Sequence, residues 1–185
     1  SDLARLAERA PPLRLLVLGG SQGAKMLNDT IPRGLAMVDA GQRPQVVHQA
    51  GEKHLAQLRE NYAAAGVAAD CVAFIDDMAG AYEWADLVVS RAGALTVAEL
   101  AAAGVASVLV PLPHAVDDHQ TANARFLELA GGAVLLPQAE LTPEAISRLC
   151  RLPFSTLQEM ATKARALARP DAAAAVATMC EEIAQ

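Results

Sequence analysis

The chain has 185 residues, enough for one large domain with a substantial buried core. A formal net charge of −6 argues against a nucleic-acid partner, and no apolar run reaches the ~20 residues of a membrane span, so we expect a soluble chain. Hydrophobic residues make up 53% but aromatic residues only 3%, which favours aliphatic side chains packed between helices and a parallel sheet.

Strands and helices are predicted to alternate as far as Pro137. Residues 3–10 are interpreted as the end of a helix or as a linker. After them, apolar runs that end in glycine, proline or polar turns indicate buried strands, and helical segments follow these strands. The predicted strands are 13–18, 45–49, 71–75, 87–89, 107–110 and 133–136. The helices between them are predicted at 24–40, 52–65, 80–84, the segment carrying Glu99, and 118–130.

Only helices are predicted beyond Pro137, over residues 142–150, 154–168 and 171–184. The pattern predicts an α/β fold: a Rossmann-like, doubly wound, six-stranded parallel sheet with extra C-terminal helices, in one domain over 1–185. Ligands of such sheets bind at the carboxyl ends of the strands. Three widely spaced cysteines (Cys71, Cys150 and Cys180) favour reduced thiols in a cytoplasm over a disulfide framework.

The loop after the first predicted strand is Gly19-Gly20-Ser21-Gln22-Gly23. It is neither the dinucleotide fingerprint, which needs G-x-G-x-x-G, nor a P-loop, because Lys25 does not follow a glycine and does not precede Ser or Thr. Two interpretations stay open. Backbone N–H groups and the Ser21 hydroxyl line a phosphate or sugar site, or the glycines only supply the dihedral angles of a tight turn.

The loop after the third predicted strand is Phe74-Ile75-Asp76-Asp77-Met78. A strand end offers one backbone N–H and one C=O, which suit the alternating acceptor and donor edge of uracil. The two aspartates are alternatively metal ligands, solvated residues or caps of the next helix. We favour the solvated or capping interpretation, because adjacent acids at a turn usually behave in this way.

The segment from Leu87 to Leu100 has the pattern of an anion site. A buried strand passes through Ser90-Arg91-Ala92-Gly93 into a helix, whose start leaves about four unpaired N–H groups and carries roughly half a positive charge. Arg91 is either an ordinary surface residue or a positive charge at this site. We favour the second interpretation and predict that a nucleotide diphosphate binds here. Two interpretations of Glu99 stay open. It forms a capping box with Thr96, which the local sequence narrowly favours, or its carboxylate accepts hydrogen bonds from both ribose hydroxyls.

The segment around the start of the helix 118–130 carries two amides and two histidines. Gln120 and Asn123 are three residues apart, hence on one helix face, and their amides suit sugar hydroxyls. Three interpretations of His114 and His119, with the two aspartates between them, stay open: a metal cluster, a catalytic acid–base pair, or hydrogen-bonding residues. The last is the most common for histidines in such loops. We expect neither a metal nor a cofactor.

Four segments at successive strand ends together closely resemble the C-terminal domain of the MurG family of bacterial GT-B glycosyltransferases. They are residues 19–24, 74–78, 90–99 and 118–124, so the resemblance covers nearly the whole chain in order. It implies an inverting N-acetylglucosaminyltransferase, which moves N-acetylglucosamine from UDP-N-acetylglucosamine to undecaprenyl-pyrophosphoryl-muramyl-pentapeptide and so converts lipid I to lipid II in peptidoglycan synthesis. It also implies peripheral attachment of the full protein to the cytoplasmic face of the bacterial inner membrane.

The same resemblance implies a set of donor-binding residues, and it reverses the preference for Glu99 as a mere cap. Family members often carry a second glutamine where this chain has His119. From base to sugar, the set is the backbone of Ile75 with Phe74 and Met78 at the uracil, Glu99 at the ribose, Ser21, Arg91 and the amides of Ala94, Leu95 and Thr96 at the diphosphate and neighbouring groups, and Gln120 and Asn123 at the N-acetylglucosamine.

A GT-B enzyme has two domains, and the resemblance implies that the N-terminal acceptor domain would precede Ser1. The general base and the membrane-facing patch would lie there, and residues 170–185 would form a helix that crosses back to it. The missing initial Met favours a domain fragment. We therefore expect this chain alone to bind the donor and transfer nothing. Two alternatives stay open: half of a UDP-sugar epimerase, or a nucleotide-sugar-binding subunit of a two-polypeptide transferase.

Overall fold

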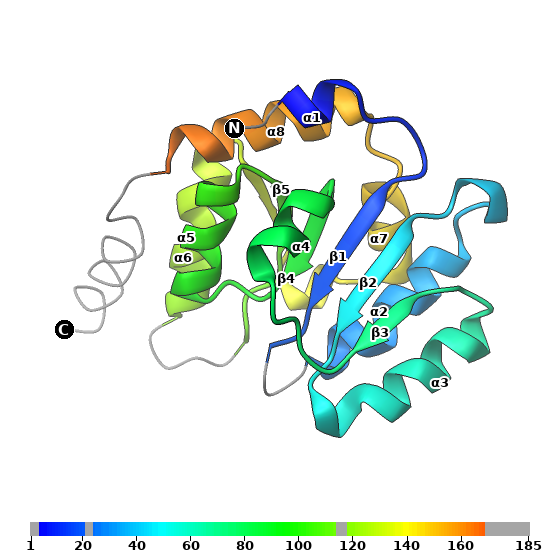
Figure 1. Ribbon diagram of the computed structural model, residues 1–185. Helices are drawn as coiled ribbons and strands as arrows, with labels where there is room; N and C mark the ends of the chain where they lie inside the picture. The colour runs from blue at the N-terminus through cyan, green and yellow to red at the C-terminus, as the bar shows by residue number, and fades with distance from the viewer. Residues whose placement is uncertain (1–3, 21–23, 114–117, 169–185) are drawn as a thin grey trace.

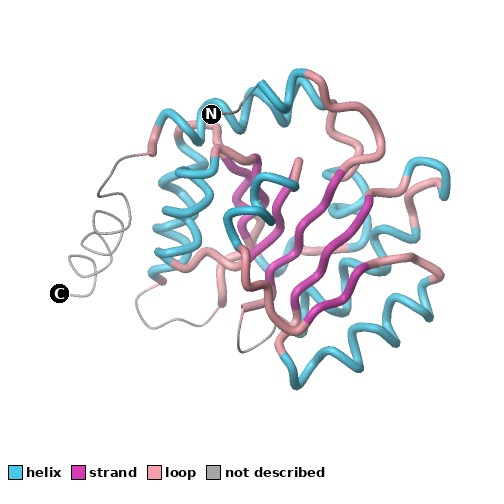
Figure 2. Tube along the Cα trace, in the orientation of Figure 1, coloured by secondary structure: helices cyan, strands magenta, loops and turns pink. Residues whose placement is uncertain are grey.

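The computed structural model describes residues 4–20, 24–113 and 118–168. At its centre lies a six-stranded parallel sheet with the strand order β3-β2-β1-β4-β5-β6 (Figures 1 and 2). The chain builds outward from β1 to β3, returns to the other side of β1, and builds outward again to β6. The strand order therefore reverses between β1 and β4, which is the doubly wound topology predicted from the sequence.

The predicted strands are confirmed, with one shortened. The third strand was expected over residues 71–75, but β3 ends at Val72, and Phe74 and Ile75 lie in the loop that follows. The parallel ladder ends where Val72 pairs with Gln49, the last residue of β2. Beyond it, the N–H groups of Ala50 and Gly51 donate to the carbonyls of Val72 and Ala73 at 3.0 Å each, and these bonds hold the start of the loop. The strands are β1 (Arg14–Leu18), β2 (Gln45–Gln49), β3 (Asp70–Val72), β4 (Leu87–Ser90), β5 (Ala106–Leu109) and β6 (Ala133–Leu135).

The helices fall where they were predicted, with shorter bounds at several ends. The one predicted over 24–40 ends at Ala36, and the one predicted over 171–184 lies outside the described residues. The α-helices are α1 (Ala4–Ala7), α2 (Lys25–Ala36), α3 (Leu55–Ala65), α4 (Met78–Trp84), α5 (Ala94–Ala103), α6 (His119–Leu129), α7 (Pro143–Leu149) and α8 (Phe154–Ala166). Short 3-10 turns are η1 (Ala40–Gln42), η2 (Glu52–His54) and η3 (Gln138–Glu140).

The sheet is buried on both faces, because helices cover each of them (Figure 1). Along β1, Leu15 and Val17 pack into a core with α2, α3 and α7. Leu16 points to the opposite face and packs into a second core with α4, α5 and α6. The period of two in a strand sends neighbouring side chains to opposite faces, so a strand between two helical layers must be apolar throughout.

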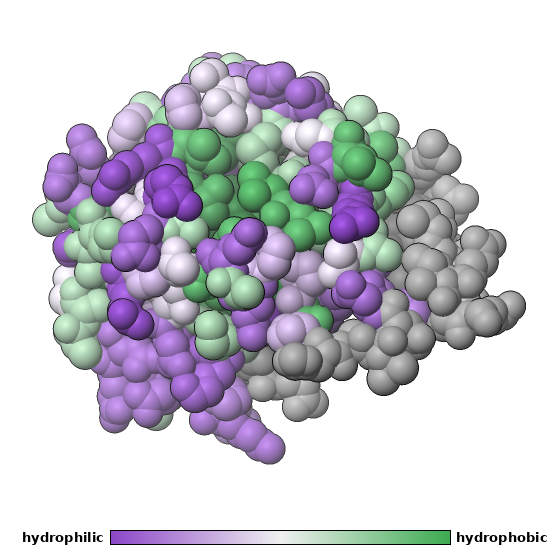
Figure 3. Space-filling view, turned by 180° about the vertical axis from the view of Figure 1, so that it is seen from behind, coloured by the Kyte–Doolittle hydropathy of each residue, from purple (hydrophilic) through white to green (hydrophobic). Residues whose placement is uncertain are grey.

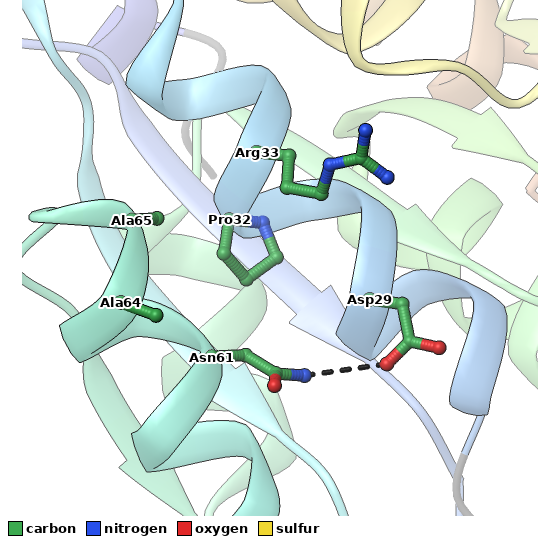
Figure 4. A pocket seen from close by; sticks show the side chains of 6 residues that line it. All are labelled: Asp29, Pro32, Arg33, Asn61, Ala64 and Ala65. Atoms are coloured by element: carbon green, nitrogen blue, oxygen red, sulfur yellow. Dashed lines mark hydrogen bonds between the residues drawn. The ribbon is translucent and has the colours of Figure 1, made fainter.

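Helix α2 continues through Pro32, which has no backbone N–H to donate to the carbonyl of Asn28 one turn earlier. The side-chain amide of Asn61 in α3 donates to this carbonyl at 3.0 Å and replaces the missing helix bond. Figure 4 shows Asn61 beside Pro32, with its second hydrogen bond, 3.3 Å long, to the carboxylate of Asp29. Packing between the two helices therefore compensates for the proline.

Segments from both ends of the described chain meet at the amino ends of the strands. Helix α1 lies against α8, and the two are seen side by side at the top of Figure 1. Asp86, 1% exposed, accepts two hydrogen bonds of 2.9 Å from the guanidinium of Arg9 and one of 2.8 Å from the backbone N–H of Arg14. The pKa of Arg9 is raised, and the largest cause is its side-chain hydrogen bonding to Asp86. The carboxylate thus ties the entry into β1 to the entry into β4.

A buried histidine in β2 forms hydrogen bonds to helices α2 and α3. His48 is fully buried, and its Nδ1 lies 2.7 Å from the hydroxyl of Tyr62 and its Nε2 3.0 Å from Oδ1 of Asn28. Because the Asn28 oxygen only accepts, Nε2 carries the proton and Tyr62 donates to Nδ1. Both ring nitrogens are used by a neutral imidazole, and burial lowers its pKa from 6.5 to about 3.

The chain is expected to lose stability in mild acid through His48. Between pH 6.5 and about pH 3 the unfolded chain binds a proton at this side chain that the folded chain does not bind. The free energy of unfolding therefore falls by up to about 1.4 kcal/mol per pH unit as the pH decreases through this window. Urea denaturation at pH 7 and pH 5 measures the loss, expected to be about 2 kcal/mol larger than in the His48→Gln variant. Equal losses of stability in the two proteins would contradict the conclusion that His48 is neutral and buried in the folded chain.

The molecular surface is apolar in places and mostly hydrophilic over α3. Only Leu58 and Tyr62 of α3 are buried, and the corresponding lower left of the rear view is strongly hydrophilic (Figure 3). In the described part of the chain, no helix combines the length and apolar character needed to cross a bilayer. Cys71 and Cys150 are free thiols, whereas Cys180 lies outside the described residues.

Candidate functional site

A cavity of about 220 Å³ opens at the carboxyl ends of the strands, beside the reversal point between β1 and β4. Residues from the ends of β1, β2 and β4 and from the helices α4 and α5 line it. Four of them are predicted site residues: Met78, Arg91, Thr96 and Glu99. The rest are Leu18, Gly19, Gly20, Gln49, Tyr82 and Ser90. The structure therefore brings together residues from five separate elements in the place where doubly wound folds bind ligands.

The N-terminus of α5 presents unpaired backbone donors beside the cavity. The helix begins at Ala94 with Gly93 as its N-cap, and glycine has no side chain with which to cap. The first backbone bond closes from Val97 N–H to the Gly93 carbonyl at 3.0 Å, so the amides of Ala94, Leu95 and Thr96 precede the helical bonding pattern. Leu95 is 65% exposed. These amides and the helix dipole suit an anion, and the binding of an anion here stays a prediction.

Arg91 lies between β4 and α5, and carbonyl and amide oxygens hold its guanidinium. It donates to Oε1 of Gln138 at 2.7 Å and to the carbonyls of Val110 and Pro111 at 3.4 Å each. All of these partners are neutral, and no described carboxylate pairs with the guanidinium. Partial burial lowers the pKa of Arg91, but an arginine remains cationic at neutral pH. An oriented positive charge held by neutral groups therefore lies at the cavity wall, which is not the environment of an ordinary surface arginine.

Glu99 does not form the capping box that its local sequence favoured. Thr96 lies inside α5 rather than at its N-cap, so the geometry of a capping box is absent at this helix start. Oε2 of Glu99 instead accepts a 2.8 Å hydrogen bond from the hydroxyl of Tyr82 in α4. Burial, followed by this bond, raises the pKa of Tyr82, so the phenol stays a donor. A carboxylate has about four acceptor positions, so Glu99 can accept further bonds from a ligand in the cavity.

The loop after β3 leads directly into α4, and the solvated or capping interpretation of its aspartates is confirmed: Asp76 is exposed, and Asp77 is a cap. Asp77 is the N-cap of α4, and its Oδ1 accepts from the N–H of Gly80 at 2.9 Å. Phe74 is 58% exposed, Ile75 is half-buried, and Met78 is the first residue of the helix. The predicted contact of this loop with uracil stays a prediction, with Met78 as the one residue of the three that lines the cavity.

Gln120 and Asn123 on α6 contact the backbone of the loop that carries Arg91. Oε1 of Gln120 accepts from the N–H of Ala92 at 3.2 Å and from that of Leu112 at 2.8 Å. Asn123 is 3% exposed, and its amide donates to the carbonyl of Ala92 at 2.9 Å. Both side chains thus hold the turn between β4 and α5 in place, a role the sequence did not suggest. Their predicted contacts with sugar hydroxyls remain predictions.

Sequence reasoning missed two residues of the cavity, Gln49 and Tyr82. Gln49 was considered only as the last residue of a strand, although a glutamine that ends a buried strand is a usable signal for a site. Tyr82 was considered only as part of a short helix. The chain has two tyrosines, and an aromatic residue one turn into the helix after the Phe74–Met78 loop was a further signal.

Other predicted features lie outside the described residues or away from the cavity. Ser21, His114 and Asp117 are not among the described residues. Within the part of the chain that the structure describes, no group of three or more His, Cys, Asp or Glu side chains is placed to hold a metal ion. A larger cavity of about 440 Å³ lies between α2 and α3 (Figure 4), lined by helix side chains that include no predicted site residue.

Comparison with known proteins identifies relatives over nearly the whole chain. Residues 14–179 match the model of the glycosyltransferase family 28 C-terminal domain. The chain is 65% identical over 181 residues to the UDP-N-acetylglucosamine--N-acetylmuramyl-(pentapeptide) pyrophosphoryl-undecaprenol N-acetylglucosamine transferase of Dechloromonas aromatica, and 61% identical over 182 residues to that of Aromatoleum aromaticum. Each match covers 98% of this chain and 51% of the relative, so the chain spans about half the length of these curated relatives.

Solved structures show the same relationship at the level of the fold. The crystal structure of Acinetobacter baumannii MurG superposes with a TM-score of 0.84 at 42% sequence identity, covering 98% of this chain and 53% of that one. The structure of Os79 from O. sativa superposes with a TM-score of 0.63 at 18% identity, covering 98% of this chain and 44% of Os79, which is a likeness of fold alone.

Proposed function

Because this chain belongs to the glycosyltransferase family 28 C-terminal domain family, we propose that it is the donor-binding half of an inverting N-acetylglucosaminyltransferase. The full protein would move N-acetylglucosamine from UDP-N-acetylglucosamine to the lipid-linked muramyl-pentapeptide. The observation that carries the proposal is the convergence of Arg91, the open amides of α5 and Glu99 around one cavity at the topological switch point. Arg91 and these amides match the diphosphate of a nucleoside diphosphate, and Glu99 matches its ribose.

The chemistry proposed for this half is stabilisation of the leaving group. When the acceptor hydroxyl attacks the sugar, the bond to the diphosphate breaks and negative charge grows on the departing UDP. The amides of Ala94, Leu95 and Thr96 and the guanidinium of Arg91 are oriented donors fixed before the reaction, so they stabilise that charge without having to reorganise. Glu99 would accept from the ribose hydroxyls and keep the nucleotide in register with these donors.

The acceptor side of the reaction is proposed to lie on the other half of the full protein. That half would supply the general base, the lipid-linked acceptor site and the contact with the cytoplasmic face of the inner membrane. Curated relatives that are about twice as long as this chain support this division. The chain by itself is therefore expected to bind the donor without transferring the sugar.

Calorimetric titration of the chain with UDP-N-acetylglucosamine, UDP, UDP-glucose and CDP tests the donor assignment. We expect saturable binding of UDP-N-acetylglucosamine and UDP with a Kd of about 0.1 to 1 mM. CDP is the matched control, because cytosine reverses the donor and acceptor positions that a backbone N–H and C=O would recognise in uracil. Equal affinity for CDP and UDP, or no binding of either uridine ligand, would contradict the proposal. Sugar transfer by this chain alone would contradict the division between the halves.

A further inference from the structure

Gln49 is a buried polar side chain that joins two loops at the cavity. It is the last residue of β2 and is 7% exposed. Its Oε1 accepts from the N–H of Gly20 at 3.0 Å, and its Nε2 donates to the carbonyl of Gly20 at 3.1 Å and to that of Ala73 at 3.0 Å. A primary amide has two N–H donors and one carbonyl acceptor, and here each of them has a backbone partner.

The two loops that Gln49 joins carry different parts of the proposed donor site. Gly20 follows β1 and lines the cavity beside the proposed diphosphate donors. Ala73 directly precedes Phe74 and Ile75, which are proposed to contact the base. Backbone bonds fix each loop to the end of β2 separately, from Gly19 N–H to Gln49 at 2.9 Å and from Gly51 N–H to Ala73 at 3.0 Å. The Gln49 side chain contacts both loops at once.

The bonds to Gly20 also constrain an unusual backbone conformation. Gly20 has φ of +75°, in the left-handed region that glycine adopts without a steric cost. Glycine is also free to leave that region, so an external constraint is needed to keep one conformation. The Gln49 amide supplies it by bonding the N–H and the carbonyl of the same residue. Its position on a paired strand makes the constraint rigid.

We infer that Gln49 is a positioning residue that aligns the loop at 73–75 with the loop at 19–20, so that one ligand can contact both. The inference rests on the proposed function, because the donor is the ligand that would span the two loops. Misalignment by about an ångström is expected to weaken a ligand that needs both loops much more than a ligand that needs one. Gln49 itself need not contact the reacting atoms.

Titration of UDP-N-acetylglucosamine and UMP into the Gln49→Met variant tests the alignment. Methionine keeps the length of the side chain and removes all three hydrogen bonds. We expect the affinity for UDP-N-acetylglucosamine to fall about tenfold and that for UMP to fall less than about threefold, because UMP depends mainly on one loop. The matched control is Gln45→Met, at the exposed start of the same strand, which is expected to change neither affinity. An equal loss for the two ligands, or no loss for either, would overturn the inference.

Amide hydrogen exchange in the absence of ligand tests the same inference independently of the donor. In Gln49→Met, exchange at Gly20 and at residues 73–75 is expected to rise about tenfold above that in Gln45→Met. No rise at either loop sinks the inference, whatever the ligand results. If the rise is seen but the wild-type chain binds no uridine ligand, the proposed function fails while the link between the loops stands. Gln49→Glu, which keeps the acceptor for Gly20 but cannot donate, serves if Gln49→Met does not fold.

Discussion

Replacing Glu99 with alanine is expected to weaken the binding of UDP-N-acetylglucosamine by about 10- to 100-fold. A hydrogen bond to a charged group contributes about 1.5 to 3 kcal/mol, and the ribose of the donor would offer two hydroxyls to this carboxylate. The carboxylate is held ready because the Tyr82 hydroxyl donates to Oε2 at 2.8 Å. Calorimetry at 25 °C measures the change in Kd.

The variant Glu99→Gln separates ligand binding from stability. The amide oxygen still accepts from Tyr82, so the thermal midpoint should stay close to that of the wild type. The amide has lost the charge and one acceptor atom, so most of the loss in affinity should remain. Glu83→Ala is the matched control, since Glu83 is an exposed acid on α4 next to Tyr82. Wild-type affinity in both Glu99 variants would limit Glu99 to holding α4 against α5.

Replacing Gly34 with valine is expected to destabilise the fold by about 3 kcal/mol. Gly34 lies where α2 packs against α7, and a Cβ placed there would be 2.6 Å from Cβ of Ile146 and 2.9 Å from the carbonyl of Pro143. Ile146 is 1% exposed, so it has little room to move away. The two helices would have to separate on one face of the sheet. For a domain of this size the thermal midpoint should fall by about 10 °C.

Gly41→Val is the matched control for this effect. Gly41 lies in the exposed turn η1, and apart from the adjoining backbone no atom comes within 4 Å of the position that a Cβ would take there, so valine meets no packed neighbour. Circular dichroism during urea and thermal denaturation of the two variants measures the difference. Similar stability of Gly34→Val and Gly41→Val would show that α2 and α7 adjust without cost, contrary to the contact distances.

The fold was predictable because its signals are local. The run from Arg14 to Leu18 is almost wholly apolar, which is required of a strand covered on both faces, and glycines follow it where the chain turns. Proline and threonine mark the start of α7, where Oγ1 of Thr142 accepts from Ala145 N–H at 3.1 Å. The end of β3 was not predictable in the same way, because it depends on the register with β2, which is a separate segment of the chain.

Glu99 shows where local sequence is misleading. Thr96 and Glu99 have the spacing of a capping box, but the helix begins two residues before Thr96, at Ala94. Two side chains of α6 hold the turn before this helix: Gln120 accepts from the N–H of Ala92, and Asn123 donates to the carbonyl of Ala92. The carboxylate is consequently available to Tyr82 and to the cavity.

The sequence by itself determined the order of strands and helices, the family, and the loops that carry Arg91, Glu99 and the glycines. These features depend on apolar periodicity, turn residues and motif spacing, all of which are written along the chain. Only the tertiary structure decided the partners of those residues: Tyr82 for Glu99, Gln138 for Arg91, and Gln49 for Gly20 and Ala73. Side-chain hydrogen bonds form between atoms about 3 Å apart, and residues far apart in sequence reach that distance only after the sheet has assembled.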